Sequence, residues 1–304
     1  MTDGIYCLAN DGVFDWMVAL LASLRAVAPD LPVVVIPYDD RVDRVSSLRS
    51  IHPFELWRDT GRLAMLDDVG HQVNPRYPRT FRKLGVFWGP LDRFVFVDSD
   101  IIVSRGIQEV LRALEPGGLF LCGDLDIEQV FLPTALRREV ESTGKVVGFN
   151  SGFFASTREA LSAEEISAGV AHIGAARSAF VTSAQEQPFL NWCVWRSDLT
   201  VTPVGKAVAD ATDFTGAGRR PLRKSADGTI RVFDPRSDDY GRRMMVVHWA
   251  GFRCTSRMPN RKLFLDYRLG QTSAAEQARF VSRWALGDPV HLAKTAVSRL
   301  RRHA

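Results

Sequence analysis

Two carboxylates stand two residues apart directly after an apolar run. Residues 94–97 read as a buried strand, and Asp98-Ser99-Asp100 follows it. Side chains alternate along extended backbone, so Asp98 and Asp100 point toward the same side. Two close carboxylates repel each other unless a positive charge lies between them, and a hard divalent cation is the usual solution. The spacing therefore predicts a metal site; the plainer alternative is a strand that ends in solvated acids.

A histidine and an asparagine stand in comparable settings. His248 follows the apolar residues 244–247, and an imidazole added to two carboxylates favours Mn²⁺ over Ca²⁺. Asn150-Ser151-Gly152 interrupts another apolar run, where backbone can approach a ligand closely, and the Asn150 amide suits sugar hydroxyls. Taken alone, a hydrogen-bonded structural histidine and a simple β-bulge are the plainer interpretations.

Glu186 and Gln187 lie side by side where a helix is predicted to begin. In a sugar site their side chains would contact hydroxyl groups or face a reacting anomeric carbon. Acidic and amide side chains are also common at the start of ordinary helices, which is the plainer interpretation. The chemistry of this pair therefore depends on what surrounds it.

The elements that must position these residues follow an alternating pattern. Residues 5–9 and 31–36 read as buried strands, and apolar residues between 14 and 24 recur at helical spacing. Strand–helix–strand with short links is typical of a parallel sheet flanked by helices, and ligands bind at the carboxyl ends of such strands. Further strands are predicted at 54–57, 93–97, 119–122, 149–155 and 244–249, further helices at 41–50, 79–89, 158–173 and 184–195, and loops at 210–243.

Composition restricts the class of protein. With 304 residues, 46% of them hydrophobic and 24% charged, the chain is long enough and apolar enough for one large α/β domain. No apolar run approaches the roughly 18 residues of a membrane span, and the N-terminus lacks the basic segment of a signal peptide. The four cysteines are far apart and predict buried thiols rather than disulfides or a zinc site. A cytoplasmic protein is therefore expected.

The net charge is concentrated at the C-terminus. It is formally +4, with 39 Lys and Arg against 35 Asp and Glu. Lys294, Arg299, Arg301 and Arg302 lie near the end of the chain, so residues 1–289 are formally neutral. This distribution argues against a nucleic-acid binder, which needs a basic face on the folded domain. The pattern of residues 289–304 predicts a short cationic helix. This helix is either surrounded by solvent or in weak contact with an anionic membrane.

In their order along the chain, these segments resemble the GT-A-fold nucleotide-diphosphosugar transferases. The resemblance is strongest to glycosyltransferase family 8, the glycogenin and lipopolysaccharide galactosyltransferase group, and runs from Ile5 to about Gly251. It implies a Rossmann-like α/β fold, with a mostly parallel twisted sheet flanked by helices in a single domain, residues 1–270. Residues 271–304 would form a helical, basic C-terminal tail.

The resemblance also implies a role for each segment. The metal ligands, for Mn²⁺ or Mg²⁺, would be Asp98, Asp100 and His248. The candidate catalytic residues near the donor sugar are Glu186, Gln187 and Asn150. Donor and cofactor contacts are implied for Ala9, Asn10 and Asp11 at the nucleotide base, for Lys83 in Phe81-Arg82-Lys83-Leu84, and for Asp98, Ser99, Asp100, Ser151, Gly152 and Gly251.

Two positions depart from the family pattern. The lysine expected three residues after the glycine of His-x-x-Gly is Cys254 here, and Arg253 or Arg257 would have to replace it. The acid expected after the Asp-Gln pair is Pro188. Both changes concern the surroundings of the diphosphate and the sugar, so they leave the metal ligands intact.

The implied reaction is transfer of a sugar from a nucleotide-diphosphate donor, a UDP-sugar, to a hydroxyl acceptor, with retained anomeric configuration. The acceptor would be a glycan, a lipid-linked molecule or a small molecule. The leaving diphosphate oxygen would itself take the proton of the acceptor hydroxyl, and Glu186 is the nearest group for charge stabilisation.

Two alternatives remain open at this point. A haloacid-dehalogenase-like phosphatase would use Asp98 as nucleophile, Asp100 as acid and Asp238-Asp239 as Mg²⁺ ligands. Its motif normally opens the domain, whereas a complete strand–helix–strand unit precedes Asp98 here. The other alternative is a non-catalytic protein of the same fold that binds a sugar nucleotide.

Overall fold

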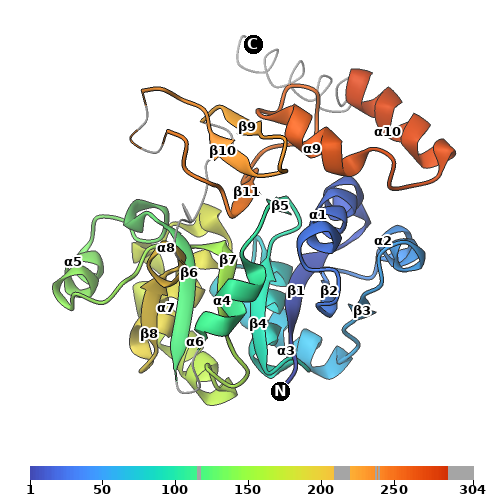
Figure 1. Cartoon of the computed structure of the whole chain (residues 1–304). Coiled ribbons are helices and arrows are strands. Elements are labelled where there is room, and N and C mark those ends of the chain that lie inside the picture. The colour runs from blue at the N-terminus through green and yellow to red at the C-terminus, as the bar shows by residue number, and fades with distance from the viewer. Residues whose placement is uncertain (115–117, 209–219, 237, 239, 287–304) are drawn as a thin grey trace, which may run out of the picture.

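The computed structural model describes residues 1–114, 118–208, 220–236, 238 and 240–286, and Figure 1 shows the course of the chain. Its N-terminal part forms the predicted strand–helix–strand unit. Strand β1 (Asp3–Ala9) pairs in parallel with β2 (Val33–Pro37), and helix α1 (Phe14–Val27) connects them. Because the apolar residues of α1 recur at helical spacing, one side of the helix is buried against the sheet.

Seven strands form the central sheet, and β4 lies in its middle. Their order is β3 (Glu55–Leu56), β2, β1, β4 (Arg93–Val97), β7 (Phe149–Thr157), β6 (Leu119–Leu125) and β8 (Thr200–Pro203). Strand β7 is antiparallel to both of its neighbours, whereas the other four pairings are parallel. The sheet is therefore mostly parallel, as predicted, and the carboxyl end of β4 lies at its centre.

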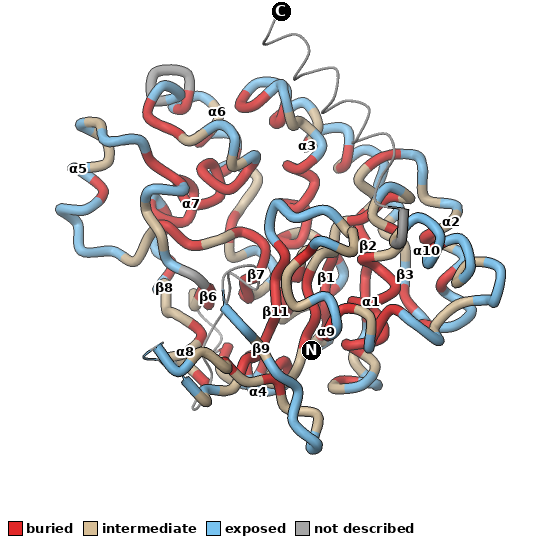
Figure 2. The backbone as a smooth tube through the Cα atoms, turned by 90° about the horizontal axis from the view of Figure 1, so that it is seen from above, coloured by how far each residue is buried: buried red, intermediate tan, exposed pale blue. Residues whose placement is uncertain are grey.

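Helices cover both faces of the sheet, and each face buries its own apolar cluster. One face packs against α3 (Thr60–Val73), the 3₁₀ helix η3 (Pro78–Trp88), α6 (Ala163–Ala176) and α7 (Gln187–Arg196). The other face packs against α1 and α4 (Ile107–Ala113). In Figure 2 buried backbone runs through the strands at the centre, and exposed residues lie at the periphery.

A C-terminal unit packs on the outer side of α1. It comprises the hairpin of β9 (Leu222–Lys224) and β10 (Ile230–Val232), the pair of β5 (Ile101–Val103) and β11 (Val246–His248), and helices α9 (Arg261–Arg268) and α10 (Ala274–Leu286). Trp16 of α1 packs against Trp249 and Phe264, with ring centroids 5.8 and 4.9 Å apart. This apolar contact fixes β11 relative to the central sheet.

The remaining helices are short. They are α2 (Asp43–Ser47), α5 (Ala135–Ser142), α8 (Val204–Ala207) and the 3₁₀ helices η1 (Asp11–Val13), η2 (Leu48–Ser50), η4 (Ile127–Gln129), η5 (Arg177–Ala179) and η6 (Thr182–Ala184). None of the helices in the described ranges combines the length and the apolar character that crossing a membrane requires. All four cysteines are free, and Cys254 is the one that is not fully buried.

Several local predictions differ from the structure. The helix predicted from residue 158 begins at Ala163, because Ser162 and Glu165 form a capping box there. The helix predicted from residue 184 begins at Gln187. The prediction of loops at 210–243 is wrong for β9 and β10, whose three-residue strands are too short for periodicity to reveal. The predicted tail helix at 289–304 lies outside the described residues, and the boundary at residue 270 stays a prediction.

Candidate active site

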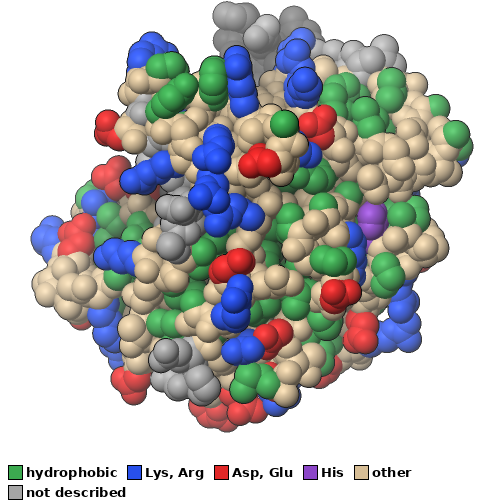
Figure 3. Space-filling model, in the orientation of Figure 1, with side chains coloured by type: hydrophobic (Ala, Val, Ile, Leu, Met, Phe, Trp, Pro, Cys, Tyr) green, Lys and Arg blue, Asp and Glu red, His purple; other side chains and the backbone are tan. Residues whose placement is uncertain are grey.

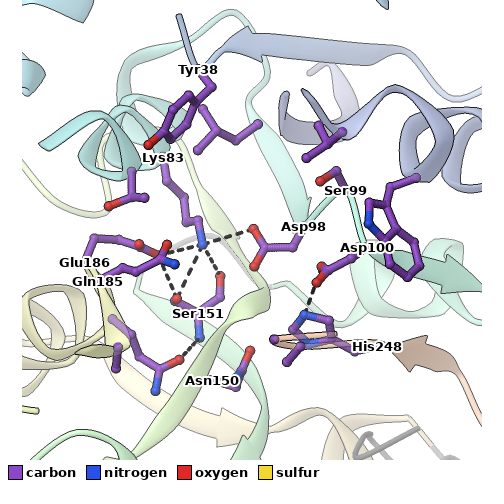
Figure 4. A pocket seen from close by; sticks show the side chains of 18 of the residues that line it. Tyr38, Lys83, Asp98, Ser99, Asp100, Asn150, Ser151, Gln185, Glu186 and His248 are labelled. Atoms are coloured by element: carbon purple, nitrogen blue, oxygen red, sulfur yellow. Dashed lines mark hydrogen bonds and ion pairs between the residues drawn. The ribbon is translucent and has the colours of Figure 1, made fainter. Parts of the chain in front are cut away.

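Two paired strands bring the predicted metal ligands together, although His248 lies far from Asp98 and Asp100 in the sequence. Strand β11 pairs with β5 so that His248 stands opposite Ile101, and the Trp249 N–H donates to the Asp100 carbonyl (3.0 Å). His248 Nε2 consequently lies 3.1 Å from Asp100 Oδ1 (Figure 4). The pairing of β5 with β11 therefore builds the imidazole into the carboxylate site.

The side chains of Asp98, Asp100 and His248 form a cradle that fits a divalent cation. One ligand atom from each residue lies within 4.8 Å of the others. Gly152 borders this cradle: its carbonyl accepts the Asp98 N–H (2.8 Å), and a Cβ atom there would stand 2.5 Å from His248 Cε1 and 2.8 Å from Asp98 Oδ2. The absent Cβ keeps the space for an ion, and two carboxylates with one imidazole suit Mn²⁺ or Mg²⁺.

Lys83 is buried beside this cradle and pairs with two carboxylates. Its ammonium lies 2.6 Å from Glu186 Oε1 and 3.1 Å from Asp98 Oδ1, and its side chain is 4% exposed. Ser151 completes the group, because its carbonyl accepts from Lys83 (3.1 Å) and its hydroxyl donates to Glu186 (2.7 Å). Helix η3, strand β7 and the start of α7 thus converge on the Asp98 side of the cradle (Figure 4).

This region carries an excess of negative charge. Asp98, Asp100 and Glu186 supply three negative charges and Lys83 supplies one positive charge, which leaves −2 when His248 is neutral. A divalent cation would bring this sum to zero. Carboxylates this close together are stable only when such compensation is present.

The pKa values in the site reflect the same imbalance. Burial has the largest effect on Asp98 and raises its pKa, because the Lys83 ammonium offsets burial only in part. Burial acts on Asp100 as well, but the charge and hydrogen bond of His248 outweigh it and lower the pKa of Asp100. Burial favours neutral forms of His248 and Lys83, yet the carboxylates outweigh it and raise the pKa of both. The acids therefore attract positive charge, which a metal ion in the cradle would supply.

Amide side chains of α7 hold β7 in place at the site. Gln187 Oε1 accepts the Ser151 N–H (3.0 Å), and Asn191 Oδ1 accepts the N–H groups of Gly148 and Phe149 (2.9 and 3.0 Å). The sequence pattern alone does not single out Asn191, although its place four residues after Gln187 puts both amides on one face of the helix. Because its oxygen is engaged, Gln187 can offer a ligand the N–H groups of its amide.

A cavity of about 600 Å³ opens over these groups. Among the predicted site residues, those that line it are Ala9, Asn10, Lys83, Asp98, Ser99, Asp100, Asn150, Ser151, Glu186, Gln187, His248 and Gly251. Gly152 lies against the cradle without lining the cavity. Asp11 does not line the cavity either, and its Oδ1 instead accepts the Val45 N–H (2.9 Å). The lining also contains residues that the sequence analysis does not identify, among them Trp16, Tyr38, Thr80, Gln185 and Phe252.

At the end of β1, Asn10 is held by its neighbours. Its Oδ1 accepts the Gly12 N–H (3.0 Å), and its Nδ2 donates to Asp39 Oδ2 (2.9 Å). The Asp39 side chain is 4% exposed and pairs with Arg41 (2.7 Å). Asp39 and Tyr38 directly follow β2, so the rule that ligands bind at the carboxyl ends of parallel strands could have identified both.

The positions that depart from the family pattern do not supply a replacement cation. Cys254 packs at the edge of the C-terminal apolar cluster, and the exposed side chains of Arg253 and Arg257 do not line the cavity. Among the described residues that do line it, Lys83 is the only lysine or arginine. A metal ion held by the cradle would therefore add to the positive charge of Lys83 in this cavity.

Comparison with solved structures identifies the fold. Galactosyltransferase LgtC in complex with donor and acceptor sugar analogs is 14% identical, with a TM-score of 0.62 over 91% of this chain and 99% of LgtC. The bifunctional glycosyltransferase WbbM is also 14% identical, with a TM-score of 0.56, and this chain spans 92% of its own length but 51% of WbbM. No sequence-family profile and no curated protein matches this chain. The chain has the GT-A fold of these glycosyltransferases, as its resemblance to family 8 predicts.

Proposed function

We propose that this protein is a glycosyltransferase that moves a sugar from a nucleoside-diphosphate donor to a hydroxyl acceptor. The observation that carries the proposal is the cradle of Asp98, Asp100 and His248, set in a cavity with an excess charge of −2 beside Lys83. A diphosphate adds further negative charge to such a cavity, so it can bind only together with a cation. The chain shares the GT-A fold with solved structures that are, by name, glycosyltransferases, and this likeness supports the proposal.

We infer that Mn²⁺ or Mg²⁺ occupies the cradle in the active protein. Bound there, the ion would act as a Lewis acid and neutralise the negative charge that develops on the departing diphosphate. Lys83 adds the only other positive charge from the described lining, and Glu186 and Ser151 hold its ammonium in place. The Lys83 ammonium therefore points toward the Asp98 side of the cavity, where we place the diphosphate of the donor.

Asn150 and Gln187 are assigned to the donor sugar. Asn150 Oδ1 accepts the Gly152 N–H (2.8 Å), as Gln187 Oε1 accepts the Ser151 N–H (3.0 Å). Both amides therefore offer N–H groups rather than oxygen atoms to the cavity, which suits hydrogen bonds to sugar hydroxyls. The backbone of β7 consequently fixes the orientation of two sugar-binding side chains.

We assign the nucleotide base to the end of β1, with UDP as the nucleotide. Ala9 and Asn10 line the cavity there, and Tyr38 follows the neighbouring strand. Asp39 and the Gly12 N–H hold the Asn10 amide in one orientation. Asp11 takes no direct part in this assignment, because its carboxylate accepts a backbone N–H of α2.

We expect transfer with retention of anomeric configuration. The described lining contains three carboxylates, Asp98, Asp100 and Glu186. The first two are committed to the cation, and Glu186 is engaged by Lys83 (2.6 Å) and Ser151 (2.7 Å). Since the described lining leaves no carboxylate to deprotonate the acceptor from the opposite face, the departing diphosphate oxygen would be the base, on the face where the acceptor attacks.

The alternatives that the sequence leaves open have less support. A haloacid-dehalogenase-like phosphatase requires acidic metal ligands at 238–239, but the exposed side chain of Asp238 does not line the cavity, and residue 239 lies outside the described part of the chain. A phosphatase also leaves His248 and Asn150 without a role. A protein that binds a sugar nucleotide without catalysis would also need the cation, and the release of UDP distinguishes it from the transferase.

Nucleotide release tests the proposal. The full-length protein is incubated with a panel of UDP-sugars, with Mn²⁺ and with the metal chelated, and free UDP is measured; an aryl phosphate monoester is assayed in parallel. We expect UDP release that depends on Mn²⁺ and no hydrolysis of the monoester. Hydrolysis of the monoester alone would establish the phosphatase. Tight UDP binding without release from any donor would establish the binding protein.

The acceptor and the location of the protein stay at the level of prediction. The hydroxyl acceptor is a glycan, a lipid-linked molecule or a small molecule. Residues 289–304, for which contact with an anionic membrane is predicted, lie outside the described residues. The cytoplasmic location likewise stays a prediction.

A further inference from the structure

The formal neutrality of residues 1–289 conceals a strong separation of charge. Residues 220–270 contain twelve Lys and Arg against five Asp and Glu, a net of +7. Residues 1–219 contain 21 Lys and Arg against 28 Asp and Glu, a net of −7. The positive segment coincides with the C-terminal unit that contains the hairpin of β9 and β10 and helix α9. The C-terminal unit is therefore strongly basic, which the averaged charge conceals.

Three arginines stand side by side on the hairpin. In the antiparallel register Arg231 lies directly opposite Arg223, and on its other side it forms a backbone bridge with Arg243. Residues opposite each other in such pairs project from the same face, and like charges in this arrangement destabilise a sheet. The opposite face carries Ile230 and Val232, which are buried in the C-terminal apolar cluster. The arginine row, Arg223, Arg231 and Arg243, therefore points away from the core.

The arginine row is held in a defined geometry. The Arg223 guanidinium lies 3.6 Å from the centroid of the Phe233 ring, which packs in turn against Tyr240 (5.9 Å). Arg231 donates from Nη1 to the Gly241 carbonyl (3.0 Å). Arg223 and Arg231 are therefore held in a fixed arrangement, and the Arg223 side chain is exposed to solvent.

The same C-terminal unit carries further exposed cations and aromatic side chains. Arg257, Arg261 and Lys262 are exposed, and within the described residues none of them forms an ion pair with an acid. Tyr240 and Phe252 are 52% and 42% exposed. Figure 3 shows Lys and Arg side chains gathered over the part of the surface where Figure 1 places the hairpin. The face thus combines dispersed positive charge with exposed aromatic rings.

We propose that this face docks on a membrane that contains anionic phospholipids. Its cations are spread over the hairpin, the 253–257 segment and the start of α9, so they match an extended anionic surface better than one small anion. Exposed aromatic rings among basic side chains are typical of proteins that lie at a lipid interface. Phe252 is exposed and also lines the cavity, so docking holds the cavity mouth near the lipid surface. The proposal needs neither the metal nor the nucleotide and stands apart from the proposed transferase activity.

Vesicle cosedimentation of the full-length protein, without nucleotide or metal, tests this docking. Vesicles of phosphatidylcholine alone are compared with vesicles that also contain phosphatidylglycerol. The variant R223Q/R231Q removes two charges from the row, and R112Q/R138Q removes two charges from exposed arginines of α4 and α5. We expect the row variant to bind anionic vesicles about thirtyfold more weakly, from about 1 kcal/mol for each basic residue near the surface, and the matched variant to bind as the parent does.

Two additions separate docking from its alternatives. R223K/R231K keeps the charge and should retain binding, which excludes a purely structural effect of losing the arginines. Soluble inorganic polyphosphate serves as a polyanion without a lipid surface. Equal weakening by both charge-removing pairs, or equal binding to the two kinds of vesicle, would overturn the proposal. Row-dependent binding of polyphosphate without binding of anionic vesicles would also overturn it, in favour of a soluble polyanionic partner.

Discussion

Asp100→Ala should abolish Mn²⁺-dependent binding of UDP while the protein stays folded. Asp100 supplies one carboxylate to the cradle and accepts from His248 at 3.1 Å, so its loss removes one ligand and leaves the imidazole without its neighbour. Changes to groups that merely orient metal ligands weaken binding by about 10- to 100-fold, and loss of a direct ligand should exceed that range. Isothermal titration of UDP in the presence of Mn²⁺ measures the effect.

Asp68→Ala is the matched control for this experiment. Asp68 is an exposed acid of α3 and does not line the cavity. Its replacement should leave the titration unchanged. Parent-like affinity in Asp100→Ala, with the circular dichroism spectrum of the folded protein, would remove Asp100 from the metal site.

Lys83→Met should both destabilise the protein and stop sugar transfer. The substitution leaves Glu186, whose side chain is 2% exposed, without its cationic partner at 2.6 Å, and it deprives Asp98 of the same charge. Removing one partner of a buried pair typically costs about 3–5 kcal/mol of unfolding free energy. Urea unfolding measures that loss, and UDP release from the preferred donor measures transfer.

A second substitution separates the two effects of Lys83→Met. The double variant K83M/E186Q removes the unpaired charge of the more deeply buried acid, Glu186, so it should recover much of the lost stability while sugar transfer stays absent. Lys206→Met, at an exposed position of α8, is the matched control and should behave as the parent in both assays. A stable and active Lys83→Met variant would show that neither Glu186 nor the donor depends on this ammonium.

The central part of the fold follows from local sequence patterns. The apolar runs that became β1 and β2 are separated by one amphipathic helix and by short links, which is sufficient to predict two parallel strands with their carboxyl ends on one side. Asp98 and Asp100 are identified by the same reasoning, since they directly follow β4. The comparison with LgtC and WbbM confirms the GT-A fold, and the role of each site residue stays a prediction.

Other parts of the site depend on contacts that sequence patterns do not contain. His248 reaches the carboxylates because β11 pairs with β5, a pairing of distant segments that no local sequence pattern indicates. Asn191 acts through hydrogen bonds to the β7 backbone, which exist because α7 packs against that strand. The position of Asp39 directly after β2 is visible in the sequence, but its hydrogen bond to Asn10 joins two neighbouring strands and is not.

The arginine row shows a different limit of sequence reasoning. Strands β9 and β10 have three residues each, and Arg231 stands between the two buried apolar residues of β10. Three residues of alternating apolar and charged side chains cannot be distinguished from a loop by their sequence pattern. The charge of residues 220–270 was visible in the sequence, but averaging over residues 1–289 cancels it against the acidic remainder.

A crystal structure with UDP and Mn²⁺ tests the central claim most directly. Anomalous scattering identifies the metal ion independently of the atomic model. The site described above predicts an anomalous peak within bonding distance of Asp98, Asp100 and His248, in contact with the diphosphate of UDP. UDP bound in the cavity with no anomalous peak at these three side chains, or with the ion held elsewhere, would contradict it.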